Sequence, residues 1–275
     1  MNRQKRRIDI LCYIGLILGS LMVLIPIIYM ISTSLKSINE IMSSRTVTLF
    51  PKKVSFEAYR NVVTEYPFFT YLKNSVVISV FSTIIAVLFS TLAGYGFSRF
   101  EFKTKGLIMM FILVTQMFPA VMLFVPYYKL LTLYGLANSR TGIVLVHIAS
   151  VIPFCSWMMY GFFNSISREL DEAARIDGAS KTQIAFKITI LLLKPVLQVC
   201  ATFSLIGALK IFDLIYVLTG GGPFFSTEVP TIYMYKTIFD SFKYGYGSAI
   251  AIFVIIECLI LTGVLRLLFR DKEKA

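Results

Sequence analysis

Six long apolar stretches decide what this chain of 275 residues can fold into. A helix rises about 1.5 Å per residue, so about 20 predominantly apolar residues are needed to cross the hydrocarbon core of a bilayer. We therefore predict an all-α fold, a polytopic helical bundle with six transmembrane helices in a single membrane domain over residues 1–275. The stretches that meet the requirement are residues 11–32, 71–98, 105–125, 141–163, 195–218 and 245–269.

Composition excludes the soluble, disordered and disulfide-rich classes. Hydrophobic residues make up 57% of the chain and charged residues only 15%, whereas soluble domains average about 45–50% and about 25%. The formal net charge is +12, but Lys and Arg gather beside the apolar stretches, as they do where a chain meets a membrane surface. We expect membrane lipid, and no nucleic acid, as a partner. The four cysteines lie in apolar stretches without a Cys-x-x-Cys pair, so we expect no metal site.

The basic residues also indicate how the chain crosses the membrane. The first apolar stretch follows a basic segment, residues 3–7, as a signal peptide would. It is much longer than the roughly 7–15 apolar residues of a signal peptide, and no small-residue cleavage site closes it, so we expect it to be retained. The segments on the side of both termini hold the larger share of Lys and Arg, which predicts that both termini are cytoplasmic.

Two of the apolar stretches carry small residues at a spacing of four, which places them on one face of a helix. Small residues let helix backbones approach closely, and this is how membrane helices gain packing energy. We expect a packed bundle, in which another subunit could take part. The residues concerned are Gly15 and Gly19 in the first stretch, and Ser82, Ala86, Ser90, Gly94 and Ser98 in the second.

The sequence contains no arrangement typical of a nucleotide-binding or catalytic site. Residues 178–182 end like a phosphate-binding loop, but they lack its leading glycine and its Gly-Lys pair. The only histidine, His147, lies within an apolar stretch, where helix packing is its expected role. We therefore expect no enzyme activity and no cofactor in this chain. Transport driven by ATP would need another chain to bind the nucleotide.

The most informative segment is the polar stretch of residues 164–188, which the predicted orientation places in the cytoplasm. Ser167 is suited to cap the start of a short helix, and Gly178 is suited to the left-handed position just past its end. Ser180 and Gln183 have the spacing of a capping box, which predicts that a second helix follows. We therefore predict two short helices joined at Gly178.

One face of the first of these helices carries little side-chain bulk. Small side chains let a helix backbone seat deeply in a partner's groove, and Glu172 can form an ion pair at the rim of such a groove. The alternative is an amphipathic helix on the inner leaflet, but such helices usually carry more large apolar anchors than this one. We favour docking into a partner protein. The residues that share the face, at spacings of three and four, are Leu170, Ala173, Ala174 and Asp177.

The motif Glu172-Ala-Ala-Arg-Ile-Asp-Gly178 follows Arg168-Glu-Leu-Asp171 and precedes Phe186, Ile188 and Pro195. This pattern resembles the EAA loop of binding-protein-dependent ABC importer permeases. Over nearly its whole length the chain is most similar to the shorter, six-span sugar permeases of the maltose-transporter type. Three further stretches support the resemblance, namely residues 31–36, 92–100 and 116–119.

The chain also departs from the pattern of that family. The family often has proline where Ser167 and Leu191 stand here. Residues 212–223 look more like the longer partner permease of such systems. Which half of the permease pair this chain represents is therefore left open.

The resemblance implies the fold of a type I ABC importer permease in the bacterial cell membrane, and an ATP-driven import of oligosaccharides or related sugars. It implies as partners a second homologous permease subunit, two ATPase subunits that bind ATP and Mg, and an extracytoplasmic sugar-binding protein. It also implies that the loop forms a coupling helix, which fits a cleft in an ATPase subunit. The residues onto which this role carries over are Glu172, Ala173, Ala174, Asp177 and Gly178.

Two loops, residues 33–70 and 219–244, are predicted on the outer side. The second contains a glycine run, which gives the backbone freedom to approach another surface closely. Contact with a delivering protein and a plain flexible turn are equally consistent with this run. The candidate contact residues are Gly220, Gly221, Gly222 and Pro223.

Glu257 lies near the middle of the sixth predicted span, where a charge is costly unless it faces water, the bundle interior or a polar partner. We expect it in the translocation path together with Gln116, with which it could pair. A stand-alone secondary transporter is the alternative function, because charges at the membrane midplane are typical of that class. The sequence has no convincing internal repeat, and Glu257 is its only clear midplane acid, which favours the ABC permease.

Overall fold

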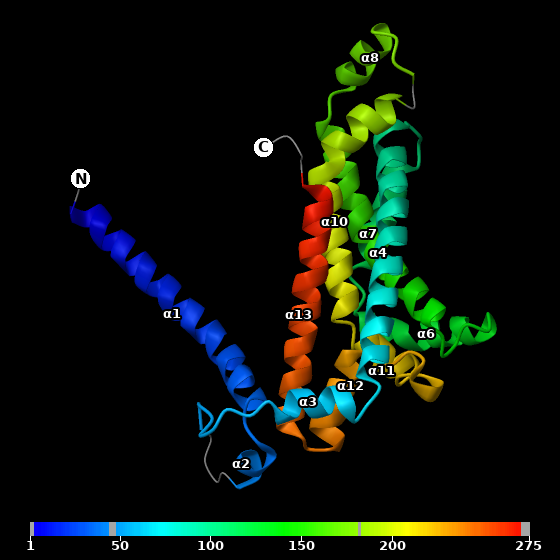
Figure 1. Ribbon diagram of the computed structural model, residues 1–275. Coiled ribbons are helices and arrows are strands. Elements are labelled where there is room, and N and C mark those ends of the chain that lie inside the picture. Colours follow the sequence, from blue (N-terminus) through cyan, green and yellow to red (C-terminus); the bar gives the residue numbers. More distant parts are fainter. Residues whose placement is uncertain (1–2, 44–47, 181–182, 271–275) are drawn as a thin grey trace. The chain divides into compact units, whose positions relative to one another are not determined.

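The computed structural model describes residues 3–43, 48–180 and 183–270, and over these residues the chain forms helices and no strand (Figure 1). The all-α prediction is therefore confirmed. In this part of the chain five helices are long and apolar enough to cross a membrane unaided. They are α1 (Arg3–Ser34), α4 (Phe68–Arg99), α7 (Arg140–Ser165), η1 with α10 (Ile184–Leu209) and α13 (Tyr244–Phe269).

The third predicted span, residues 105–125, is wrong as a continuous helix. It is divided between α5 (Lys105–Thr115) and α6 (Ala120–Leu133), which are bent by 100° relative to each other. Pro119 precedes α6 with an extended ψ of 124° and has no N–H to donate, so helical hydrogen bonding stops there. Among the described residues the number of spans is six if α5 and α6 together form one broken span, and five if they do not.

The fifth predicted span, residues 195–218, is also corrected. The helix starts earlier, with a π-helical turn η1 (Ile184–Thr189), and continues as α10 (Ile190–Leu209). A separate short helix, α11 (Asp213–Leu218), follows it. The break between α10 and α11 allows three side chains of α11 to enter a buried cluster with side chains of α6 and α7, which a straight helix would not reach.

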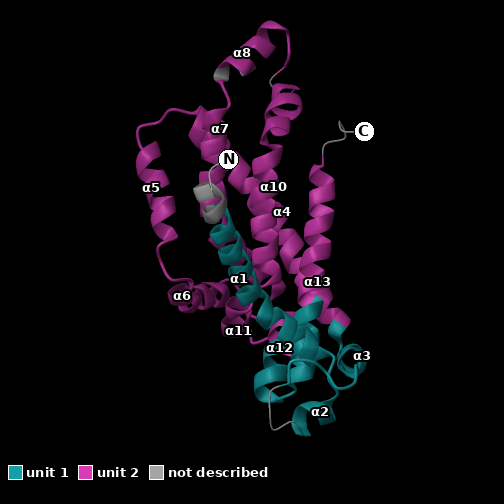
Figure 2. Cartoon of the chain, turned by 90° about the vertical axis from the view of Figure 1, so that its left-hand side faces the viewer, with its two compact units in different colours: residues 1–68, 233–253 teal, residues 69–232, 254–275 magenta. Residues whose placement is uncertain are grey.

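The chain divides into two compact units (Figure 2). Unit 1 comprises residues 1–68 and 233–253, and unit 2 comprises residues 69–232 and 254–275. The single membrane domain over the whole chain stays a prediction. The short helices of the two expected outer loops are α2 (Ile38–Ser43), α3 (Glu57–Thr64), η2 (Pro223–Phe225), α12 (Pro230–Tyr235) and η3 (Lys236–Asp240).

Unit 1 is held together at the end of α1. The hydroxyl groups of Ser34 and Tyr59 lie 2.7 Å apart, and the ring of Tyr59 packs edge-on against Phe253 of α13, with 5.8 Å between centroids. Farther along α1 the apolar side chains are exposed, and no described heavy atom lies within 4 Å of a Cβ built at Gly15 or Gly19. Close packing at these two glycines is therefore not made within the described chain, and packing against another subunit stays a prediction.

Unit 2 contains the close helix contact that the small residues of the second span predict. A Cβ at Gly94 would lie 2.5 Å from the Cβ of Met159 and 3.0 Å from its backbone, so the backbones of α4 and α7 touch there. Ser98 of α4 also donates a hydrogen bond of 2.7 Å to Asn164 of α7. The prediction is confirmed, because all five small residues are buried: Ser82, Ala86, Ser90, Gly94 and Ser98.

Candidate functional site

The first helix predicted in the cytoplasmic loop is present as α8 (Arg168–Ile176). Its start is capped as expected, because the Ser167 hydroxyl accepts a hydrogen bond of 3.2 Å from the backbone N–H of Glu169. A helix this short is marginal in water on its own, and the cap satisfies one of its free N–H groups. The local sequence therefore fixes the residue at which α8 begins.

Gly178 ends α8 in the left-handed conformation, with a φ of +84°. The N–H of Gly178 bonds to the carbonyl of Arg175 at 3.0 Å, and the N–H of Ala179 bonds to the carbonyl of Ala174 at 2.9 Å. These two bonds form a Schellman motif, which favours glycine because a side chain is strained at positive φ. The predicted end of the helix is confirmed.

Ser180 and Gln183 form the predicted capping box. The side-chain oxygen of Gln183 accepts a bond of 2.8 Å from the N–H of Ser180, and the Ser180 hydroxyl accepts one of 3.3 Å from the N–H of Gln183. The prediction that this box starts a second short helix is wrong, because it starts the long helix of η1 and α10. Within unit 2, α8 lies beyond the ends of α7 and α10, between which it stands in the chain (Figure 1).

The predicted docking face of α8 is open to the surroundings. Among the residues that the structure describes, none covers its acidic rim, its first alanine or its terminal glycine, and its second alanine is partly buried. Such a face is available to another molecule. The exposed residues are Glu172, Ala173, Asp177 and Gly178, and Ala174 is half-buried.

Sequence reasoning missed Ile176, which is 86% exposed. It follows Ala173 by three residues, so the two lie next to each other on the helix surface. With Leu170, which is 48% exposed, it gives the open surface a second large apolar side chain beside the alanines. The spacing from Ala173 was visible in the sequence and could have added Ile176 to the face.

A hollow of about 390 Å³ lies where α8 joins η1. The described residues of its lining include the acidic Asp177 and the basic Lys187, and two small residues, Gly178 and Ala179, lie on the α8 side. A partner's side chain can therefore enter next to the end of α8. The lining residues are Asp177, Gly178, Ala179, Gln183, Lys187 and Ile188.

The glycine run of the outer loop forms a hydrogen-bonded turn. Gly220, Gly221 and Gly222 have φ values of +57°, +103° and +73°. The turn is closed by bonds from the N–H of Gly222 to the carbonyl of Thr219 at 2.8 Å and from the N–H of Thr227 to the carbonyl of Gly221 at 3.0 Å. A Cβ at Gly222 would lie 2.5 Å from the hydroxyl of Thr227, so the site requires glycine.

The segment after the glycine run is anchored to unit 2 but presents one free aromatic ring. Arg140 at the start of α7 donates a bond of 2.7 Å to the carbonyl of Ser226, and Asn74 of α4 donates one of 2.7 Å to the carbonyl of Glu228. Between the glycines and these anchors, Phe224 is 100% exposed and has a φ of +50°. Sequence reasoning missed Phe224, because its exposure is set by the tertiary anchors around it.

Glu257 and Gln116 are not brought together. Glu257 of α13 is only 8% exposed, and its carboxylate has no hydrogen-bond partner among the described residues, although the hydroxyl of Ser75 in α4 lies close to it. Gln116 lies exposed at the break between α5 and α6 and donates a bond of 3.4 Å to the carbonyl of Ser150. The expected pair is not formed, and each residue remains a separate candidate for the translocation path.

Comparison with known proteins decides what these elements belong to. The family described as "binding-protein-dependent transport system inner membrane component" matches residues 86–274, which include the loop of residues 164–188 and the glycine run. The chain belongs to this family. It is a multi-pass inner-membrane component of a transport system, with a role in transport and not in catalysis.

Relatives and a solved structure agree with this assignment. The permease is 31% identical over 251 residues to the diacetylchitobiose uptake system permease protein of Streptomyces coelicolor, covering 91% of this chain and 82% of the relative. It is 33% identical over 212 residues to the trehalose/maltose transport system permease protein of Thermococcus litoralis, covering 76% of this chain and 75% of the relative. A chain from a bacterial ABC transporter involved in the import of the acidic polysaccharide alginate matches with a TM-score of 0.80 at 26% identity, covering 98% of the permease and 99% of that chain. The predicted ABC importer permease fold is confirmed.

Proposed function

We propose that this permease is a membrane subunit of an ATP-driven importer of oligosaccharides or related sugars, and that it forms the translocation path with a second homologous permease subunit. The relatives described above are named for diacetylchitobiose and for trehalose/maltose, and the solved structure for alginate import. All of these solutes are carbohydrates, which supports a carbohydrate for this chain. The observation that carries the proposal is α8, a helix capped at both ends whose small-residue face is open.

In this proposal α8 is the coupling helix and seats in a cleft of an ATPase subunit. Ala173 and Ala174 allow a close approach of the helix backbone, and Glu172 pairs with a basic residue at the rim of the cleft. Asp177 and Gly178 form the end of the helix and one wall of the adjoining hollow. Two ATPase subunits bind ATP and Mg, and this chain binds neither.

In the proposal α8 is connected to the bundle through the chain at its two ends, and contacts within unit 2 hold the neighbouring helices α4, α7 and α10 together. At the α8 end, Ser98 of α4 and Asn164 of α7 are hydrogen-bonded at 2.7 Å. Deeper in the bundle the Thr83 hydroxyl of α4 donates to the hydroxyl of Ser204 in α10 at 3.2 Å, and His147 of α7 lies 3.3 Å from the carbonyl of Ser204. Tightly packed helices move as rigid bodies, so a displacement of α8 carries the ends of α7 and α10 with it.

On the other side of the membrane, the turn of Gly220, Gly221, Gly222 and Pro223 holds Phe224 outward for contact with an extracytoplasmic sugar-binding protein. An exposed aromatic ring on a rigid turn contributes apolar contact at little conformational cost. This orientation places both termini in the cytoplasm, in line with the distribution of basic residues.

Glu257 and Gln116 contribute to the translocation path in this proposal. A buried carboxylate without a hydrogen-bond partner is costly inside a membrane protein, so it is retained where a solute, water or a second subunit satisfies it. Gln116 lies at the broken third span, and irregular backbone at membrane depth is tolerated where it lines a cavity or is covered by protein.

The test is to purify the full-length permease with its natural partners and reconstitute the assembly in vesicles. We expect an ATPase and a second permease to co-purify, and sugar uptake to require both ATP and the binding protein. Uptake that is driven by an ion gradient in the absence of any ATPase would contradict the proposal and support a stand-alone secondary transporter.

A further inference from the structure

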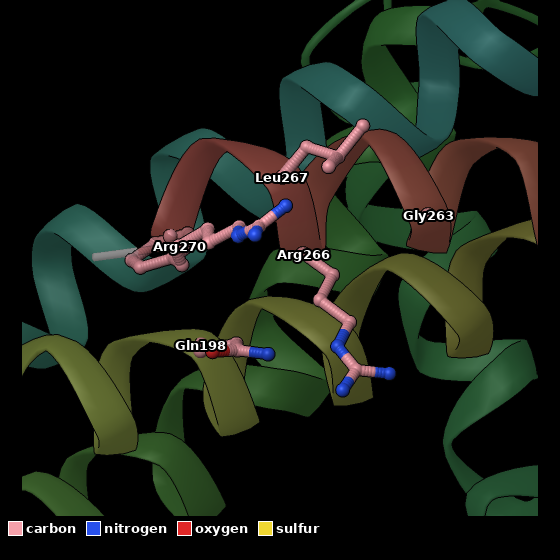
Figure 3. A pocket seen from close by; sticks show the side chains of 6 residues that line it. Gln198, Gly263, Arg266, Leu267 and Arg270 are labelled. Atoms are coloured by element: carbon pink, nitrogen blue, oxygen red, sulfur yellow. The ribbon is translucent and has the colours of Figure 1, made fainter. Parts of the chain in front are cut away.

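A pocket of about 530 Å³ lies between α10 and the last turns of α13, within unit 2 (Figure 3). The guanidinium groups of Arg266 in α13 and of Arg270, the residue just after α13, line it, and the side-chain amide of Gln198 lines it from α10. The rest of the lining consists of Gly263, Leu267 and Phe269. The pocket therefore combines a cationic wall with an apolar one.

The two arginines have no ion pair with any residue that the structure describes. Basic residues at a helix C-terminus also interact favourably with the helix dipole and mark the cytoplasmic side. These general roles account for positive charge at the end of α13. They do not account for two arginines, one helical turn apart, that line the same pocket as an amide donor from another helix.

The pocket lies at the level expected for lipid headgroups. The 26 residues of α13 span about 39 Å, which exceeds the roughly 30 Å of a hydrocarbon core. The last turn, with Arg266, therefore reaches the headgroup region. Among the described residues no heavy atom outside the adjacent helix backbone lies within 4 Å of a Cβ built at Gly263, and Leu267 is 66% exposed, so an acyl chain has room along this face of α13.

We propose that this pocket binds the phosphate of an anionic phospholipid, with the phosphate between Arg266 and Arg270 and the acyl chains along Gly263 and Leu267. Guanidinium groups bind phosphate oxygens in bidentate geometry, and the Gln198 amide supplies a further donor. Basic pockets between transmembrane helices on the cytoplasmic side are suited to such headgroups. The proposal does not depend on the coupling role of α8.

The experiment uses the full-length permease in its purified assembly, exchanged into detergent with equal amounts of phosphatidylglycerol and phosphatidylcholine, and counts retained lipid by native mass spectrometry. The unmodified chain is expected to retain phosphatidylglycerol in preference to phosphatidylcholine. Arg266→Gln and Arg270→Gln are each expected to reduce retention about fivefold, the factor that corresponds to roughly 1 kcal/mol per basic residue. Lys103→Gln, which removes an exposed charge outside the pocket, is the matched control and should leave retention unchanged.

Two further arms identify the source of the anion. A photo-cross-linking residue at Leu267 should capture lipid, and inorganic phosphate in excess should not displace the bound phosphatidylglycerol. Equal retention of the two lipids, equal retention by the arginine variants, displacement by inorganic phosphate, or capture of an acidic segment of another subunit at Leu267 would each overturn the proposal. All of these readouts are independent of transport, so a failure here is distinguishable from a failure of the proposed import function.

Discussion

The inner loop around Gly178 and the glycine run of residues 220–222, both in unit 2, use glycine differently. Gly178 has a φ of +84°, and no heavy atom of the described residues beyond its chain neighbours lies within 4 Å of a Cβ built there. Gly222 has a φ of +73°, and a Cβ there would lie 2.5 Å from the Thr227 hydroxyl. The inner glycine thus serves only the backbone conformation and leaves its surroundings open. The outer glycine is enclosed by its own chain.

This difference shows where each loop can meet another protein. At the inner loop, the open surface consists of the helix face itself, next to the glycine that ends it. At the outer loop, the glycines form a tight turn. The surface exposed next to them is the ring of Phe224. A glycine run in a sequence therefore indicates backbone with positive φ. The residue that contacts a partner has to be found from the exposure of the residues next to the run.

The largest expected effect is that of Gly178→Val, which removes the glycine that ends α8. A β-branched residue in the left-handed conformation costs roughly 1–2 kcal/mol or more, so the end of α8 should rearrange. We expect sugar uptake to fall at least tenfold while the amount of inserted permease is unchanged. Gly178→Asn should restore part of the uptake, because asparagine tolerates this conformation.

Gly135→Val is the matched control, since Gly135 also has a positive φ of +67° and open space around it but precedes α7 at the other end of the unit. The Gly135→Val variant should hydrolyse the same amount of ATP per sugar transported as the unmodified permease. If both valine variants lost uptake to the same extent, backbone strain and not coupling would explain the result.

Glu172→Lys should have the next largest effect, because it reverses the charge at the rim of the docking face without disturbing either cap of α8. We expect about a tenfold weaker association with the ATPase subunit, measured by co-purification at increasing salt. Glu101→Lys, a charge reversal at another exposed acidic residue, is the control. Unchanged association of the Glu172 variant would contradict a rim ion pair.

Gly222→Ala tests the tight turn of the outer loop. The added methyl group meets Thr227 in a turn that cannot yield freely, and such overpacking costs typically about 1–3 kcal/mol. We expect faster proteolysis of the outer loop and a severalfold lower uptake. Gly220→Ala, where φ is also positive but the space is open, should have the weaker effect on both measurements.

The smallest effect is expected for Phe224→Ala, which removes the exposed ring and leaves the turn intact. We expect uptake at limiting binding protein to fall about threefold, with no change at saturation. Phe242→Ala is the control, because Phe242 is also exposed (67%) and also has a positive φ, of +55°. Equal behaviour of the two variants would assign no contact to Phe224.

A structural feature of this permease could be predicted from the sequence where residues close to it in the chain determine it. The bounds of α8 follow from Ser167 and Gly178, and each acts on backbone groups within five residues of itself. The seam between α4 and α7 follows from a periodic row of small residues. Both were predictable from sequence because few competing structures satisfy such patterns.

The break in the third span was not predictable in the same way. Pro119 lies at the break, yet Pro26, Pro153 and Pro195 lie inside uninterrupted helices. Whether proline ends a membrane helix depends on which neighbouring groups satisfy the freed carbonyl groups, and that is a tertiary property. The same holds for Phe224, whose exposure depends on anchors supplied by α4 and α7.

Photo-cross-linking from Ala173 in the assembled transporter tests whether α8 docks into an ATPase subunit. A photoreactive residue there should capture the ATPase subunit, and the yield should change when ATP is added, because the subunits close on the nucleotide. The same residue placed at Glu101 should give no such nucleotide-dependent product. Capture of lipid alone from Ala173, with no second polypeptide, would contradict the docking of α8 into an ATPase subunit.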